Sequence, residues 1–192
     1  LPNLATGVKI NRVEIWVTNK TGTTSNTRNI VALTDLGENN GVSRPDLWGP
    51  GSGAVPSNQA NGEYQTIAQG HPEARDIDQA SSALEGMGLV GGTDFEKLSS
   101  ARLLSSSEYT VNTSLGYVSL RAGLQADQVL AVAYEYTYGG VTYQVGEFSS
   151  DRTNVGEALF VKALKNTSNN PAQGNWRLMM KNVYYLASTV QK

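Results

Sequence analysis

The 192-residue chain has no cysteine and only one histidine, His71. Without cysteine there can be no disulfide framework, no thiolate metal site and no cysteine nucleophile. A zinc site would need nitrogen ligands beyond His71, and a Ser-His-Asp triad would depend on this one imidazole. Because His71 lies between Gly70 and Pro72, we interpret it as an exposed turn residue. We predict that the chain is not an enzyme, with no catalytic residues, metal site or cofactor.

The chain also lacks a strong charge excess and any long apolar run. Its 15 basic and 17 acidic residues give a net charge of −2, and no basic cluster is available to neutralise a nucleic-acid backbone. No stretch approaches the roughly 18 to 20 apolar residues of a membrane-spanning helix, and the N-terminus lacks the pattern of a signal peptide. We expect a soluble domain with no nucleic-acid partner. A patterned segment so close to Leu1 would suit a domain excised from a larger protein.

Turn-forming residues and alternating runs indicate a β-rich chain. Twenty glycines accompany abundant serine, threonine and asparagine, which is typical of many turns. Residues 9–19 alternate Ile15 and Val17 with Glu14 and Trp16, and this period of two predicts a strand with one buried face. Residues 27–36 form the next predicted strand. The two strands would pair as a hairpin with a long loop.

Residues 129–148 predict a second hairpin together with its register. Two alternating runs meet at Gly139-Gly140, a pair that accepts the positive φ angles of a two-residue turn. The predicted pairs are Tyr138/Val141, Tyr136/Tyr143 and Tyr134/Val145 on one face, and Thr137/Thr142 and Glu135/Gln144 on the other. A slip of one residue would mix the apolar set with the polar set, so the register is specified. We expect the tyrosine face to pack into the core; the alternative is a sugar-stacking platform that includes Trp16.

The remaining patterns predict short strands, one to three short helices and a long insertion. Strands are expected at residues 109–111, 117–120 and 159–164. Helices are expected at residues 73–85, 94–104 and 176–186, with a strand as the alternative for the last two. A loop and helix insertion spans about residues 37–92, where most prolines lie. The predicted fold is mainly β with short helices, an antiparallel β-sandwich-like single domain over residues 1–192 with a C-terminal helix.

Acidic residues offer candidate sites that their spacing does not support. Asp76 with Asp78, and Asp94 with Glu96, stand two residues apart and would point to different faces of a helix. Neither pair therefore converges as the two carboxylates of a glycosidase must. Residues 35–40 contain oxygen ligands without the alternating spacing of a calcium loop. We assign no binding residue from these patterns.

Several segments resemble the SprA/Sov family of gliding and secreting Bacteroidetes. The strings that carry the resemblance, in chain order, are VKINRVEIWVTNKTGTTSNTRNIVALTDLGE, DFEKLSSARLLSSSEYTVNTSLGYVSL, ADQVLAVAYEYTYGGVTYQVGEFSSD, LFVKAL and WRLMMKNVYYL. Their order and spacing match over most of the chain, and residues 37–92 are the least distinctive part.

This resemblance implies the outer-membrane translocon of the type IX secretion system, a very large β-barrel that exports folded adhesins and proteases. The chain is too short to be that barrel, so it would be one soluble domain of it, facing the periplasm, the pore or the cell surface. The expected partners are other domains of the same translocon, further type IX subunits and exported cargo. Membrane association would come only through the parent barrel, and the expected role is structural.

Two other functions stay open at this point. One is a carbohydrate-binding β-sandwich module that uses exposed aromatic residues such as Trp16, Trp48 and Tyr64. The other is a hydrolase that combines His71 with a distant serine and aspartate.

Overall fold

The computed structural model describes residues 7–51, 55–113, 116–168 and 170–177. Its strands are β1 (Lys9–Val17), β2 (Thr27–Leu33), β3 (Phe95–Leu103), β4 (Tyr109–Asn112), β5 (Tyr117–Leu120), β6 (Leu130–Tyr138), β7 (Val141–Val145) and β8 (Leu159–Lys165). Its helices are α1 (Pro45–Trp48), α2 (Glu63–Gly70) and α3 (Ala80–Gly86), with the 3₁₀ helices η1 (Pro72–Arg75) and η2 (Gly174–Arg177). The prediction of a mainly β chain with short helices is confirmed.

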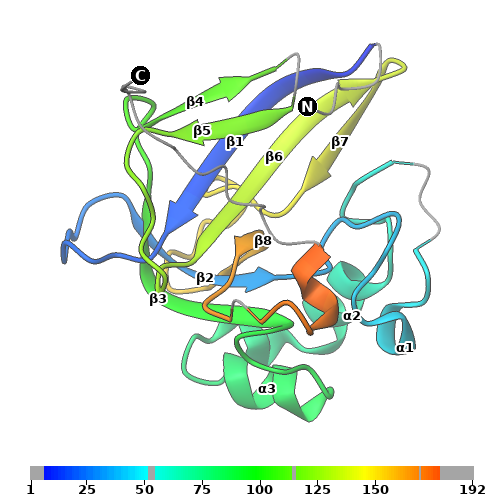
Figure 1. The fold of residues 1–192 in the computed structure, drawn as a ribbon. Helices are drawn as coiled ribbons and strands as arrows, with labels where there is room; N and C mark the ends of the chain where they lie inside the picture. The colour runs from blue at the N-terminus through cyan, green and yellow to red at the C-terminus, as the bar shows by residue number, and fades with distance from the viewer. Residues whose placement is uncertain (1–6, 52–54, 114–115, 169, 178–192) are drawn as a thin grey trace, which may run out of the picture.

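The main sheet closes on itself (Figure 1). Its strand order is β1-β3-β2-β8-β6-β7, and β1 also pairs with β6 along most of its length. One edge of β6 pairs with β1, while its other edge pairs with β8 at residues 130–132 and with β7 at residues 134–138. The strands β1, β3, β2, β8 and β6 therefore form a barrel-like ring, and the β6–β7 hairpin extends beyond it.

The indole of Trp16, surrounded by alanines and larger apolar side chains, fills the interior of this ring. Trp16 is 1% exposed and packs in a cluster with alanines of the other four strands, namely Ala32, Ala101, Ala131, Ala133 and Ala163. Interior positions of a narrow barrel accept only a few large side chains, so small residues must complement them. The prediction that β1 has only one buried face is wrong, because its second half, including Trp16, is buried on both faces.

Two layers cover the outside of the ring. The helices pack on β2 and β8, where Ile67 of α2 meets Phe160 of β8, and they lie below the barrel in Figure 1. The small β4–β5 sheet packs on β1 and β6, where Val118 and Leu120 meet Ile15. Burial on both faces explains why β8 reads as a nearly continuous apolar run.

The β6–β7 hairpin has the predicted register. All five predicted pairs are present, from Tyr138↔Val141 at the turn to Tyr134↔Val145. Gly139 and Gly140 have φ angles of 57° and 80°, as a turn with two positive φ angles requires. Tyr134 and Tyr136 pack inward as expected, whereas Tyr138 at the tip is 37% exposed.

Two sequence predictions about strands are wrong. β1 and β2 do not form a hairpin, because β3 lies between them in the sheet. Residues 94–104 do not form the expected helix but contain the strand β3, which was the alternative left open by the sequence. Leu98 and Ala101 both face the barrel interior because a bulge lies between them, with Ser100 at a φ of 51°. The bulge changes the strand period of two into a spacing of three, which imitates a helix.

The other predicted elements agree in part. The strands expected at 109–111, 117–120 and 159–164 are β4, β5 and β8. The helix expected at 73–85 is divided into η1 and α3, since the backbone at Asp76 is extended. Most of the C-terminal helix expected at 176–186 lies outside the described residues, and Trp176 belongs to η2.

Candidate functional site

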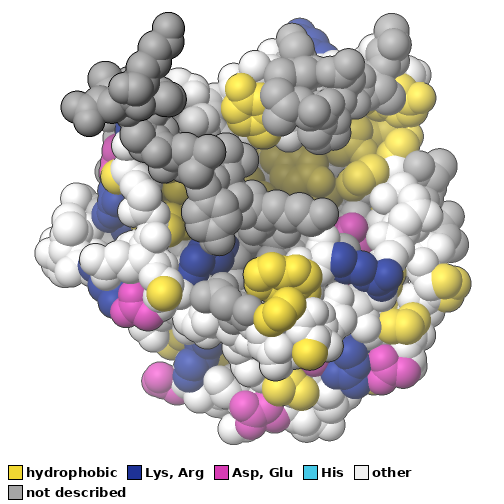
Figure 2. All heavy atoms as spheres, in the orientation of Figure 1, with side chains coloured by type: hydrophobic (Ala, Val, Ile, Leu, Met, Phe, Trp, Pro, Cys, Tyr) yellow, Lys and Arg dark blue, Asp and Glu magenta, His cyan; other side chains and the backbone are white. Residues whose placement is uncertain are grey.

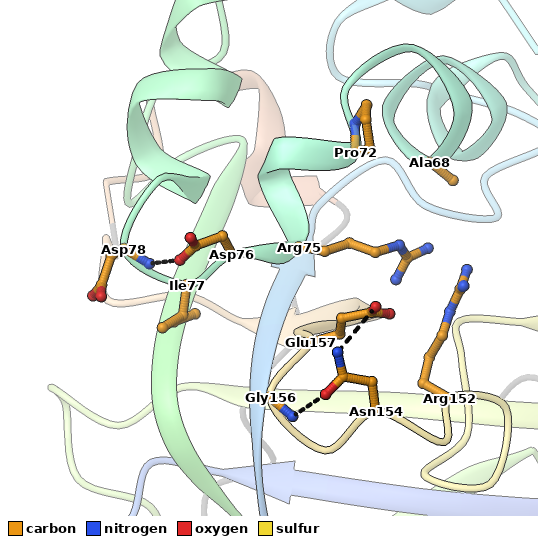
Figure 3. Close-up of a pocket in the computed structure, with 10 residues that line it drawn as sticks. All are labelled: Ala68, Pro72, Arg75, Asp76, Ile77, Asp78, Arg152, Asn154, Gly156 and Glu157. Atoms are coloured by element: carbon orange, nitrogen blue, oxygen red, sulfur yellow. Dashed lines mark hydrogen bonds between the residues drawn. The ribbon is translucent and has the colours of Figure 1, made fainter.

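A cleft of about 680 Å³ lies between η1 and the loop that joins β7 to β8 (Figure 3). Figure 3 shows the side chains of Arg75 and Arg152 pointing into the same space from the two walls. Asp76 and Asp78 come from the segment after η1, and Glu157 comes from the opposite loop. The cleft therefore brings together charges of both signs from segments about 75 residues apart.

Glu147, just after β7, is the carboxylate that connects these two walls. It accepts hydrogen bonds from Arg75 Nη1 at 2.9 Å and Arg75 Nη2 at 2.7 Å, from Arg152 Nη2 at 3.1 Å and from the Tyr64 hydroxyl at 2.8 Å. The backbone N–H of Phe160 donates a further bond at 2.9 Å. One side chain thus connects α2, η1, the β7–β8 loop and β8.

The protonation of Glu147 follows from these contacts. Burial by itself would raise its pKa, but the hydrogen bonds and charge of Arg75, with the bonds from Phe160 and Tyr64, hold the pKa of Glu147 below its usual value. Burial and the neighbouring Glu147 carboxylate raise the pKa of Tyr64 to about 12. At neutral pH the carboxylate is therefore ionised and the phenol keeps its proton.

Arg28 organises the loop that carries Arg152. Arg28 is 9% exposed. Its guanidinium donates to the backbone carbonyls of Ser149, Arg152, Asn154 and Glu157 at 3.1 to 3.4 Å. The two Nη groups of the planar guanidinium supply these four bonds, an arrangement that a lysine could not reproduce. The loop is thus built around a buried cation of β2.

A second buried group of charges lies where the insertion leaves β2. Glu63 is 1% exposed, and its Oε2 has no hydrogen-bond partner among the described residues. Lys162 donates to the Thr34 carbonyl and lies 2.6 Å from an oxygen of Glu38. Burial and the nearby Asp35 carboxylate raise the pKa of Glu63 well above its usual value, against the opposing charge of Lys162. Glu63 therefore favours its protonated form.

Asp35 belongs to the same group and holds the start of the insertion. Its two carboxylate oxygens accept the backbone N–H groups of Ser43 at 2.6 Å and Arg44 at 2.8 Å. The side chain of Arg44 in turn binds Asp94 at 2.7 Å. Within the described ranges no cluster of three or more histidine or carboxylate side chains is arranged to hold a metal ion.

The acidic pairs considered from the sequence do not converge. Asp76 accepts the backbone N–H of Asp78 and the side-chain amide of Gln79. Asp94 is buried against Arg44, whereas Glu96 accepts bonds from Thr167.

The single histidine occupies the turn between α2 and η1. His71 Nδ1 lies 3.0 Å from Glu73, and about a third of its side chain is exposed. His71 therefore lies in a turn, as expected, but is half-buried and not fully exposed.

The three aromatic residues named for a carbohydrate-binding module, Trp16, Trp48 and Tyr64, are buried or half-buried. Trp16 fills the barrel, and the Tyr64 hydroxyl is bound to Glu147. Trp48 is half-buried against the helical layer. The large aromatic side chains with the greatest exposure among the described residues are instead Tyr117, Tyr138 and Trp176.

Sequence patterns did not identify Glu147, Arg75, Arg28 or Glu63. Their partners come from segments far away along the chain, which spacing cannot show. One signal was present: Lys162 interrupts the apolar run of β8, and a charged residue in a strand buried on both faces requires a buried partner.

No protein-family model matches this chain, and a search of the curated proteins finds no match. In the ranges that the structure describes, no helix is long and apolar enough to cross a membrane.

Proposed function

We propose that this chain is a non-enzymatic structural and interaction domain of a SprA-like outer-membrane translocon, the export channel of the type IX secretion system. The strings that resemble this family fall on the framework of the fold. They contain β1 with β2, β3 to β5, β6 with β7, and β8. The resemblance therefore concerns residues that build the barrel and its covering sheet.

The observation that supports a structural role most directly is the environment of Glu147. Its five hydrogen bonds come from α2, η1, the β7–β8 loop and β8. Charged groups that bind one another in this way hold surface segments in fixed positions. Such a domain presents loops and sheet edges at defined places, as a subunit of an assembly must.

In this proposal the domain has no chemical activity and works by holding contacts with other components in place. It belongs to the outer membrane through its parent barrel and contacts other translocon domains, type IX subunits and exported cargo. The sandwich-like character expected from the sequence would lie where the β4–β5 sheet faces β1 and β6 across Ile15, Val118 and Leu120.

An in-frame deletion of the codons for residues 7–177 in the parent gene tests this function. We expect that the strain no longer exports folded cargo to the medium and no longer glides. A matched strain carrying Arg102→Gln, which removes one partly exposed ion pair with Glu108, should export normally. Unchanged export and gliding in the deletion strain would overturn the proposal.

A further inference from the structure

β7 is the last strand of the main sheet, and half of its backbone groups face away from β6. In a hairpin with a two-residue turn, the pair beside the turn and every second pair after it share hydrogen bonds. Thr142 and Gln144 fall between these pairs, so their N–H and C=O groups point to the outer edge. The Gln144 carbonyl confirms this direction, since it accepts the N–H of Asn58 at 2.8 Å.

The part of this edge next to the turn lacks charges, prolines and bulges. β7 reads VTYQV, without a charge or a proline, and its pairing with β6 shows no register shift. Sheets commonly protect their edges with lysine, proline or bulges. Val141 is 51% and Tyr138 is 37% exposed, and Figure 2 shows hydrophobic side chains in the region where Figure 1 places this hairpin. The strand is therefore a template for further pairing.

The chain itself already occupies the inner end of the edge. Besides its bond to Gln144, Asn58 exchanges side-chain hydrogen bonds with the backbone of Gly146 at 2.8 and 3.3 Å. The carbonyl of Pro56 accepts the Tyr136 hydroxyl at 2.6 Å. Toward the turn, no other backbone in the described ranges bonds to the outer side of Thr142. The pairing that residues 56–58 begin thus stops one step before Thr142.

We propose that the outer edge of β7 at residues 141–143 binds an extended strand of another polypeptide. Thr142 offers one donor and one acceptor along the strand, so the occupant must have an extended backbone. The occupant must also be uncharged here, because β7 has no charge to compensate a desolvated lysine or glutamate. Apolar side chains at alternate positions would pack beside Val141 and Tyr143.

A second copy of this chain would not be held by the edge alone. β7 has five residues, and two such strands side by side bury far less than the roughly 800 Å² per partner of a stable interface. A strand from another subunit of the same assembly does not need so large an interface, because the assembly holds the strand close to β7 at a high effective concentration. This binding does not depend on what the parent protein exports.

Fluorescence anisotropy tests the proposal with a labelled peptide in which valine and threonine alternate between terminal lysines. We expect Thr142→Pro to weaken binding by about tenfold, as loss of one backbone hydrogen bond and a steric clash would do. The hairpin should stay folded, because the Thr142 N–H does not bond to β6. Thr142→Val is the matched control: it keeps the N–H and should bind the peptide like the original chain.

Amide hydrogen exchange of the free chain checks the same geometry without a ligand. The Thr142 amide should exchange fast and the Tyr143 amide slowly, and added peptide should slow Thr142. Three results would overturn the proposal. These are no peptide binding at millimolar concentration, equal binding by Thr142→Pro, and self-association that Thr142→Pro abolishes, which would assign the edge to a second copy.

Discussion

Arg75 binds both carboxylate oxygens of Glu147 and lies 4.1 Å from the centre of the Phe160 ring. The two charged side chains are 9% and 2% exposed. A fork-to-fork contact of this kind fixes both distance and angle between the two groups. It therefore sets the position of η1 relative to the end of β7 and to β8.

Glu147→Gln should destabilise the fold strongly. The substitution leaves the buried Arg75 guanidinium without its counter-charge, a change that costs about 3–5 kcal/mol. Urea unfolding followed by circular dichroism measures the free energy of unfolding. Arg102→Gln, at the more exposed Arg102–Glu108 pair, is the control and should stay within about 1 kcal/mol of the original chain. Equal effects of the two variants would contradict the structural role of Glu147.

Arg28→Lys should loosen the loop between β7 and β8. A lysine keeps the charge but loses the planar fork that binds the four carbonyls of this loop. We expect faster amide exchange over residues 149–157 and a loss of about 2 kcal/mol in unfolding free energy. Arg121→Lys, at an exposed position, is the control and should change neither quantity. Unchanged exchange in Arg28→Lys would show that the loop is held by other contacts.

Glu63→Gln should change how stability depends on pH. The folded pKa of Glu63 is raised, by burial and then by Asp35, and Glu38 and Asp94 add to this while Lys162 opposes it. The protonated carboxyl of Glu63 therefore contributes fully to the stability of the original chain below the pKa that Glu63 has in the unfolded chain. This contribution is lost as the pH rises through the pKa that Glu63 has in the folded chain. Glutamine cannot ionise. The free energy of unfolding of Glu63→Gln, relative to that of the original chain, should therefore increase above pH 4.5. The increase should be about 1.4 kcal/mol per pH unit until the pKa of Glu63 in the folded chain is reached.

Urea unfolding of both chains from pH 4 to pH 8 measures this difference. A constant difference across the range would mean that Glu63 ionises in the folded chain as it does in the unfolded chain.

Ser100→Gly should stabilise the chain. Ser100 adopts a φ of 51° in the bulge of β3, where a side chain is disfavoured and glycine is not. The gain is about 0.5–1 kcal/mol, measured as a rise in the free energy of unfolding. Ser99→Gly, one residue earlier in the same strand, is the control and should destabilise by a similar amount. A loss of stability in Ser100→Gly together with a gain in Ser99→Gly would contradict the described bulge.

The sequence predicted those elements that are determined by residues close to one another in the chain. The β6–β7 register follows from Gly139-Gly140 and two alternating faces, all within 20 residues, and the structure confirms it. The helix predicted for residues 94–104 is absent, because a bulge at Ser100 moves Ala101 to the face of Leu98 and gives the strand β3 a helix-like spacing. A bulge depends on the partner strand, so its effect on the period cannot be recognised in one segment.

Barrel closure and the buried charges depend on contacts between distant segments. β1 and β6 pair across more than 100 residues, as in Trp16↔Ala131, and this pairing places Trp16 inside a ring. Arg75 and Glu147 are 72 residues apart. Either residue alone looks like an ordinary surface charge, so only the folded structure reveals the pair.

The reading frame that encodes this chain, sequenced through both flanks, tests the assignment to a translocon most directly. We predict a frame on the order of thousands of residues, rich in alternating strands about ten residues long. A frame that ends near Lys192 and contains no barrel strands would contradict it.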